Sequence, residues 1–187
     1  MTLEGTFKQG FGAGLFTFSP NPAFLDTVRA MGVGVESEKR RDGRERDQDA
    51  RLLQFALSDV STAFIQSMRA AGYDVSLDKY LAFRIFNITP AYLRELNDLG
   101  YRDLDSDAIT SFRIHKVTPE FIRGIRELGY DDIPARKLVA MRIHRVTPEF
   151  VRELKAAGYS GIPIDKLISM RIHGVDAEFA KRMNGTK

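Results

Sequence analysis

The chain has 187 residues, of which 43% are hydrophobic and 28% charged, with a formal net charge of +3. This composition suffices for a hydrophobic core. No apolar run approaches the roughly 20 residues that span a bilayer, so we expect no membrane insertion by this chain. The absence of cysteine excludes disulfides, thiolate metal sites and cysteine nucleophiles.

The first 20 residues differ from the rest of the chain. The stretch GTFKQGFGAGLFTFSPNP, residues 5–22, places β-branched and aromatic residues around a glycine-rich centre. This pattern predicts a β-hairpin lead-in over residues 1–20. Because an isolated hairpin is marginally stable, it should pack on the next segment or pair with another chain, and homo-oligomerisation through the hairpin is one hypothesis.

Residues 21–187 contain a repeat. Copies that end in Gly-Tyr have their glycines at 72, 100, 129 and 158, so the period is 28 to 29 residues. An earlier copy, with its glycine at Gly32, is lengthened by an insert at about 36–49 that has charged residues and no apolar side chain. We expect this insert to be a loop, or a solvated helix held by opposite charges. A truncated copy starts at Phe179.

The sequence pattern of each repeat predicts two short helices. Thr-Pro at 89–90, 118–119 and 147–148 is typical of a helix start, and the Gly-Tyr pair is typical of a helix end. The second helix, about 134–144 and 163–173 in two copies, is apolar on nearly all sides and should be buried between neighbours; in the first of these copies its apolar residues are Leu138, Val139, Ala140, Met141 and Ile143. The predicted fold is therefore all-α: an α-solenoid of about five to six repeats of ~29 residues over 21–187, preceded by the hairpin.

The three histidines occupy one repeat position, in RIHKVTPEF, RIHRVTPEF and RIHGVDAEF. Stacked helices lie about 8–10 Å apart, whereas zinc ligands lie about 2 Å from a shared ion. His115, His144 and His173 are therefore badly spaced for one metal, and we expect each to bond the last carbonyls of its helix. We predict neither a metal site nor a cofactor.

The arginines are the candidate binding residues. One row lies on the second helices and another on the first helices. A planar guanidinium matches a carboxylate or a phosphate, so a regular row could bind an extended acidic chain. The first-helix row could instead pair with nearby glutamates and aspartates. The second-helix row either lines the concave surface of the solenoid or closes a buried ion pair between repeats. The two rows are Arg84, Arg113, Arg142 and Arg171 on the second helices, and Arg94, Arg123 and Arg152 on the first.

The charge is unevenly distributed. Residues 112–187 contain 15 Lys and Arg against 9 Asp and Glu. A basic carboxyl-terminal part attracts acidic protein, anionic lipid or nucleic acid. Because the basic residues alternate with acidic ones and no recognition helix is evident, we favour a protein or acidic peptide partner over nucleic acid. A structural or oligomerisation module is a further alternative.

No motif predicts catalysis. The GFGAG stretch at 10–14 lacks the GK[ST] of a phosphate-binding loop, and the chain has neither a nucleophile elbow nor HExxH. We therefore predict a non-enzymatic binding domain.

The repeat phrase has a specific resemblance. The stretches VTPEFIRGIRELGY (117–130), VTPEFVRELKAAGY (146–159) and KLVAMRIHRV (137–146) resemble repeats in bacterial proteins of the BlaR1/MecR1-like M56 peptidase group. GTFKQGFGAGLFTFSPNPAF (5–24) looks like the lead-in that precedes them. The resemblance implies an accessory or sensory region, extracytoplasmic in the parent protein, with no catalytic residue carried over.

Overall fold

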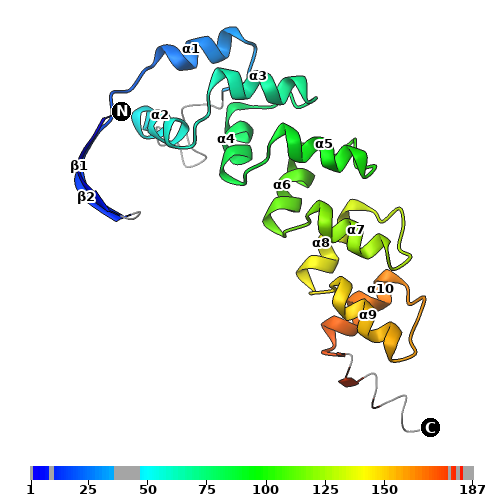
Figure 1. Cartoon of the computed structure of the whole chain (residues 1–187). Coiled ribbons are helices and arrows are strands. Elements are labelled where there is room, and N and C mark those ends of the chain that lie inside the picture. Colours follow the sequence, from blue (N-terminus) through cyan, green and yellow to red (C-terminus); the bar gives the residue numbers. More distant parts are fainter. Residues whose placement is uncertain (1, 9–10, 36–46, 177, 180–181, 183–187) are drawn as a thin grey trace. The chain divides into compact units, whose positions relative to one another are not determined.

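The computed structural model describes residues 2–8, 11–35, 47–176, 178–179 and 182. They form an all-α helical repeat fold with two short strands at its amino-terminal end (Figure 1). The chain divides into two compact units, Met1–Ile85 and Phe86–Lys187. No helix in the described part of the chain is long and apolar enough to cross a membrane.

The first unit begins with strands β1 (Thr2–Lys8) and β2 (Phe11–Thr17). They pair antiparallel, with Gly5 opposite Gly14, inside the segment for which the sequence predicts a hairpin. Residues 9–10 between them lie outside the described residues. The side chains of Leu15 and Phe16 on β2 are exposed, so the strand pair leaves apolar surface uncovered.

Helices α1 (Ala23–Ala30), α2 (Gln48–Leu57), α3 (Thr62–Ala70) and α4 (Leu77–Ile85) complete this unit. Most of the predicted charged insert, residues 36–46, lies outside the described residues. Its end differs from the predicted loop, because α2 already begins at Gln48. The Asp47 carboxylate accepts hydrogen bonds from the backbone N–H groups of Asp49 and Ala50, which starts the helix there.

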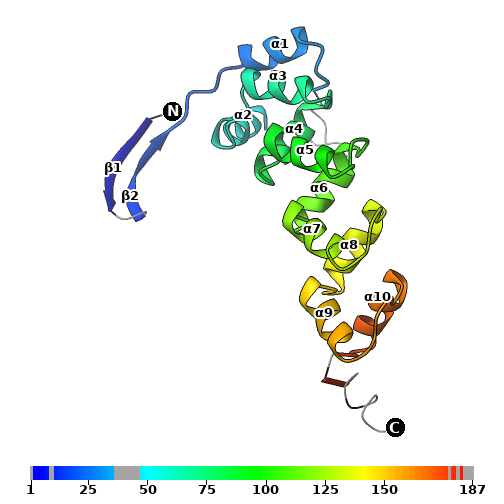
Figure 2. The same cartoon turned by 45° about the vertical axis from the view of Figure 1, so that its right-hand side comes forward.

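The second unit contains α5 (Pro90–Asp98), α6 (Ser106–Ile114), α7 (Pro119–Arg126), α8 (Ala135–Ile143), α9 (Pro148–Ala156) and α10 (Ile164–Ile172). Alternate helices touch: α6 packs on α8, α8 on α10, and α7 on α9. Figure 2 shows these helices following one another in chain order within the unit. The second helices and the first helices of successive repeats thus form two stacks, as a helical repeat requires.

The predicted helix ends are confirmed in detail. The hydroxyls of Thr89, Thr118 and Thr147 each accept the backbone N–H three residues later, and proline follows each of them. At the other end Gly129 has a φ of +92°, in the left-handed region that glycine adopts without strain.

Two of the tyrosines that follow a helix-ending glycine, Tyr101 and Tyr130, also link repeats. The N–H of Tyr101 closes the helix end by donating to the carbonyl oxygen of Leu96. The hydroxyls of both tyrosines reach the next repeat. Tyr101 Oη donates to the Ile133 carbonyl oxygen at 2.7 Å, and Tyr130 Oη to the Ile162 carbonyl oxygen at 2.7 Å. Burial raises the pKa of both phenols, so each remains a donor at neutral pH.

The core consists of one apolar stripe per helix. In α8, Leu138 and Met141 are fully buried between neighbouring repeats. The prediction that the second helix is buried on nearly all sides is wrong at its last residue, because Ile143 is 52% exposed. This residue lies at the end of α8, beyond the stripe that touches α6 and α10.

Candidate functional site

The second-helix arginines join successive repeats through the backbone. Arg84 Nε donates to the Ser58 carbonyl oxygen at 2.8 Å, Arg113 Nε to that of Phe86 at 2.9 Å, and Arg142 Nε to that of His115 at 3.2 Å. Each acceptor directly follows the last residue of the preceding second helix. Carbonyls there have no partner within the helix and carry partial negative charge. Arg84 and Arg142 therefore cap α2 and α6, the second helices of the repeats before them.

The same guanidinium groups cover an aromatic ring of the first helix in their own repeat. The Cζ atom lies 4.6–4.9 Å from the ring centroid, a distance at which a cation is attracted to the ring face. The pairs are Arg84 with Phe64, Arg113 with Tyr92, Arg142 with Phe121 and Arg171 with Phe150. One side chain thus ties a first helix, a second helix and the preceding repeat together.

Arg171, in the last complete repeat, differs from the other three. Its Nε is buried without a hydrogen-bond partner. The ion-pair alternative for this row also has little support. Arg84 pairs with Asp59, but Asp59 is mostly exposed, and the acceptors of Arg113 and Arg142 are backbone oxygens.

Tyr92 lies beneath Arg113 in this arrangement. Its hydroxyl donates to the Val117 carbonyl oxygen at 3.0 Å, and its side chain is buried. Burial raises the pKa of Tyr92 to about 12, although the nearby Arg113 cation acts in the opposite direction. The phenol therefore remains neutral, and keeps its hydrogen bond, over the physiological range.

A parallel set of contacts occurs between first helices. Arg69 Nη1 donates to the Met31 carbonyl oxygen at 2.6 Å, and Arg126 Nη2 donates to that of Leu99 at 2.7 Å. Met31 and Leu99 are the C-caps of α1 and α5. In both stacks, therefore, an arginine donates a hydrogen bond to the carbonyl oxygen at the end of an earlier helix.

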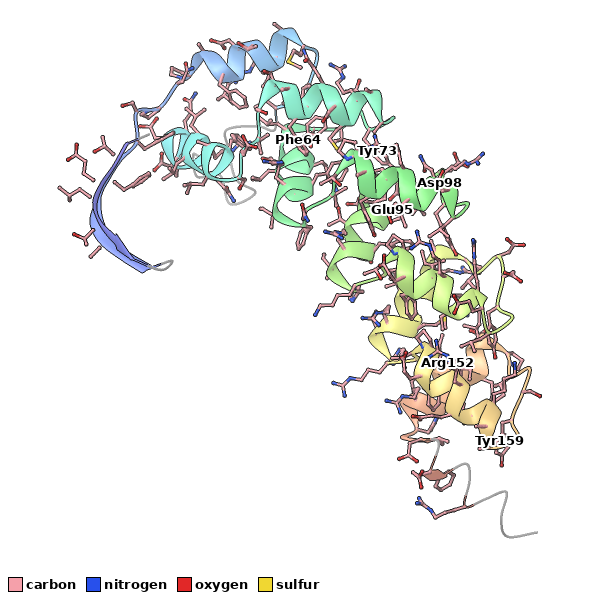
Figure 3. The ribbon with its side chains drawn as sticks, in the orientation of Figure 1. Phe64, Tyr73, Glu95, Asp98, Arg152 and Tyr159 are labelled. Carbon is pink, nitrogen blue, oxygen red and sulfur yellow. The ribbon has the colours of Figure 1, made fainter. Side chains whose placement is uncertain are left out.

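The first-helix arginines are exposed, and two of them take part in surface ion pairs. Arg123 lies 3.6 Å from Glu95 on the preceding first helix and 3.6 Å from Glu120 on its own. Arg152 pairs with Glu149 at 3.2 Å; Figure 3 labels Arg152 on α9 and Glu95 on α5. Arg94 is exposed on α5. Exposed pairs of this kind stabilise by less than about 1 kcal/mol, so these side chains can rearrange to meet a partner.

The three histidines cap the second helices, where the sequence places them. His115, His144 and His173 are the C-cap residues of α6, α8 and α10. His173 Nδ1 lies 2.7 Å from the Ser169 carbonyl oxygen, in the last turn of its helix. In the described part of the chain, no group of three or more His, Cys, Asp or Glu is placed to hold a metal ion.

Two hollows open beside the ends of the second helices in the second unit. The first has two cations, no carboxylate and an apolar wall; its lining is Phe86, Phe112, Arg113, Lys116, Val117 and Thr118. The second holds three arginines and three carboxylates; its lining is Arg142, Arg145, Thr147, Glu149, Phe150, Glu153, Arg171 and Asp176. Lys116 and Arg145 occupy equivalent, exposed positions directly after the histidines. The hollows therefore place Arg113, Arg142 and Arg171 beside free surface cations that the sequence reasoning did not select.

Comparisons with models of known protein families, with curated proteins and with solved structures give no match to this chain.

Proposed function

We propose that this chain is a non-enzymatic α-solenoid of about five to six helix-pair repeats that binds a protein or peptide. One observation carries the proposal. Helices α6, α8 and α10 touch in succession, and each ends in a half-buried arginine followed by an exposed isoleucine. A surface that repeats at regular intervals suits a linear partner, whose groups also recur. On the resemblance to the M56 peptidase group, the partner would belong to a bacterial envelope sensing system.

The structure changes which residues should be altered to test this function. Charge reversal at Arg113, Arg142 and Arg171 would remove the contacts that join the repeats, so loss of binding would not distinguish a binding role from unfolding. Lys116 and Arg145 are exposed at the same edge and make no contact of that kind. They are the better positions for a test of binding.

The test is selection of binding peptides from a displayed random library on the immobilised chain. We expect enriched peptides to bind the wild type and to bind Lys116→Glu/Arg145→Glu about tenfold or more weakly. The matched control is Arg136→Glu/Lys166→Glu, which changes two exposed cations in the first turns of α8 and α10. The absence of any enriched peptide would contradict the proposal.

Nucleic-acid binding is the second candidate, favoured by the basic excess of residues 112–187. Its test is fluorescence anisotropy of a labelled random DNA duplex, titrated with the chain at low and moderate salt. Several phosphate contacts would weaken binding by about 10³-fold between 50 and 200 mM salt. Absence of binding at low salt would exclude this candidate.

Self-association through the strands is a third candidate, since Leu15 is 76% and Phe16 44% exposed on β2. An edge strand with apolar side chains can pair with a second copy. Analytical ultracentrifugation tests it: sedimentation as a monomer at every concentration would exclude this role.

A further inference from the structure

One exposed apolar side chain ends each second helix. Leu57, Ile85, Ile114, Ile143 and Ile172 are 61, 54, 50, 52 and 57% exposed, and each is the last residue of its helix. They are five of the eight large apolar side chains that are exposed in the described part of the chain. The exposure is therefore concentrated at one repeat position, which singly scattered surface residues would not show.

Folding does not require an apolar residue at this position. The helices end there without help from the side chain, because the backbone after Ile143 is already closed by hydrogen bonds from His144 and Arg145. The apolar core of each second helix lies at other positions, such as Leu138 and Met141 in α8. If this position faced only solvent, a polar side chain there would be equally compatible with the fold.

In the second unit these isoleucines lie along one side. Helices α6, α8 and α10 touch in order, and Ile114, Ile143 and Ile172 occupy the same position in each. Axes of packed helices are about 8–10 Å apart. Successive isoleucines are therefore separated by about that distance.

The surroundings of this row are basic. The equivalent segments 112–118, 141–147 and 170–176 contain three arginines of the second-helix row, Lys116, Arg145 and all three histidines, against one carboxylate, Asp176. The hollow beside Ile114 contains Arg113 and Lys116 and no carboxylate. The hollow between Arg142 and Arg171 is balanced by three carboxylates, so the excess of positive charge is strongest at the first of the two.

We propose that Ile114, Ile143 and Ile172, together with Lys116 and Arg145, form a docking surface for an acidic peptide segment with regularly spaced apolar side chains. An extended polyproline-type chain rises about 3.1 Å per residue and has three residues per turn, so every third side chain points the same way at intervals of about 9 Å. This interval matches the spacing of the isoleucines. Carboxylates between the apolar residues face the basic segments.

This proposal rests on the proposed function and specifies its ligand. It also separates a peptide from nucleic acid, because a phosphate backbone would contact the cations and leave the isoleucines uncovered. Replacing isoleucine by lysine separates the two partners. The added charge attracts either polyanion, but only the peptide also loses apolar contact, so relative to a control with the same added charge the peptide binds more weakly and a duplex does not.

The experiment uses a fluorescein-labelled synthetic peptide made of three Leu-Glu-Pro units, titrated with the full chain and followed by anisotropy. A second peptide of the same composition has its leucines consecutive. The test variant is Ile114→Lys/Ile143→Lys/Ile172→Lys, and single Ile143→Lys guards against a folding defect in the triple variant. The matched control adds three lysines elsewhere in the second unit, at the exposed positions Ala91, Ala156 and Ser160. Far-ultraviolet circular dichroism checks the helix content of each.

We expect the first peptide to bind the wild type and the control alike. Binding should fall by about 100-fold in the triple variant and about fivefold in Ile143→Lys. The peptide would cover the half of each isoleucine side chain that is exposed in the free chain, and each replacement removes that contact. The second peptide should bind more weakly than the first.

Equal binding of both peptides to all variants would overturn the isoleucine surface and leave peptide binding by charge alone. Failure of the first peptide to bind, while the library selection yields other ligands, would overturn this proposal and retain the proposed function. Failure of both experiments, with tight salt-dependent binding of the duplex that strengthens in the triple variant, would overturn both.

Discussion

Replacement of Arg142 by methionine should destabilise the second unit although no core residue changes. Methionine retains the apolar stem of the side chain and removes the guanidinium, so it isolates what that group contributes. Two contacts disappear: the hydrogen bond from Nε to the His115 carbonyl oxygen and the approach of Cζ to the Phe121 ring.

The magnitude follows from these contacts. A hydrogen bond from a charged donor contributes about 1.5–3 kcal/mol, and a half-buried cation over an aromatic ring contributes about 1 kcal/mol. The bond is long at 3.2 Å, which places it at the lower end of its range. We expect Arg142→Met to lower the free energy of unfolding by about 2–3 kcal/mol.

The assay is urea denaturation followed by circular dichroism at 222 nm. With a slope of about 2 kcal/mol/M, the midpoint should fall by about 1 M. Arg171→Met should cost only about 1 kcal/mol, because Arg171 covers Phe150 but its Nε has no acceptor. Arg123→Met, at an exposed ion pair, should stay within about 0.5 kcal/mol of the wild type.

Equal losses of unfolding free energy in Arg142→Met and Arg123→Met would refute the assigned role of Arg142. The larger loss is expected there because Arg142 is half-buried and donates to a carbonyl oxygen, whereas Arg123 is exposed. A double-mutant cycle with Phe121→Leu measures the ring contact separately, with an expected coupling of about 1 kcal/mol. A coupling near zero would assign the whole effect to the capped helix end.

Three further predictions concern single groups. Because the pKa of Tyr92 is raised to about 12 in the folded chain, the stability it provides is complete below its unfolded pKa of about 10 and is lost as pH rises through 12. Urea midpoints should therefore fall between pH 10 and 12, and less so in Tyr92→Phe; an equal fall would contradict this assignment. Thr118→Ala removes the hydroxyl that accepts the Phe121 N–H and should cost about 1 kcal/mol in thermal denaturation, whereas Ser160→Ala in an exposed loop should cost almost nothing. Gly129→Ala should cost about 1–2 kcal/mol purely through its φ of +92°, since an added Cβ would meet no atom within 4 Å; an unchanged melting temperature would show that the helix end adapts.

The local features were predictable because they depend on neighbours in sequence. A threonine hydroxyl three residues before an N–H, proline in the first turn and glycine after the last turn act within one helix, and the structure shows each of them at Thr147, Pro148 and Gly158. The helical repeat followed as well, since helices this short bury their apolar faces only against further copies.

The roles of the arginines and of Ile143 could not be predicted in the same way. The acceptor for Arg142 lies 27 residues earlier and is a backbone oxygen, to which no residue type in the sequence corresponds. The exposure of Ile143 was missed because an isoleucine in an apolar helix is usually buried, and only the packed neighbours reveal which sides they cover. The repetition of isoleucine in RIH, outside the spacing of the buried stripe, is the sequence feature from which it could have been found.

The sequence by itself determined where the helices of this protein begin and end, and that its repeats must stack, because caps and apolar periodicity act over a few residues. Tertiary structure alone decided which side of each helix its neighbours cover. This choice turned Arg84 and Arg142 into links to the preceding helix end and left one leucine or isoleucine at the end of each second helix exposed to solvent. The physical reason is that both outcomes depend on contacts between copies about 29 residues apart, whose distance and direction are set by packing.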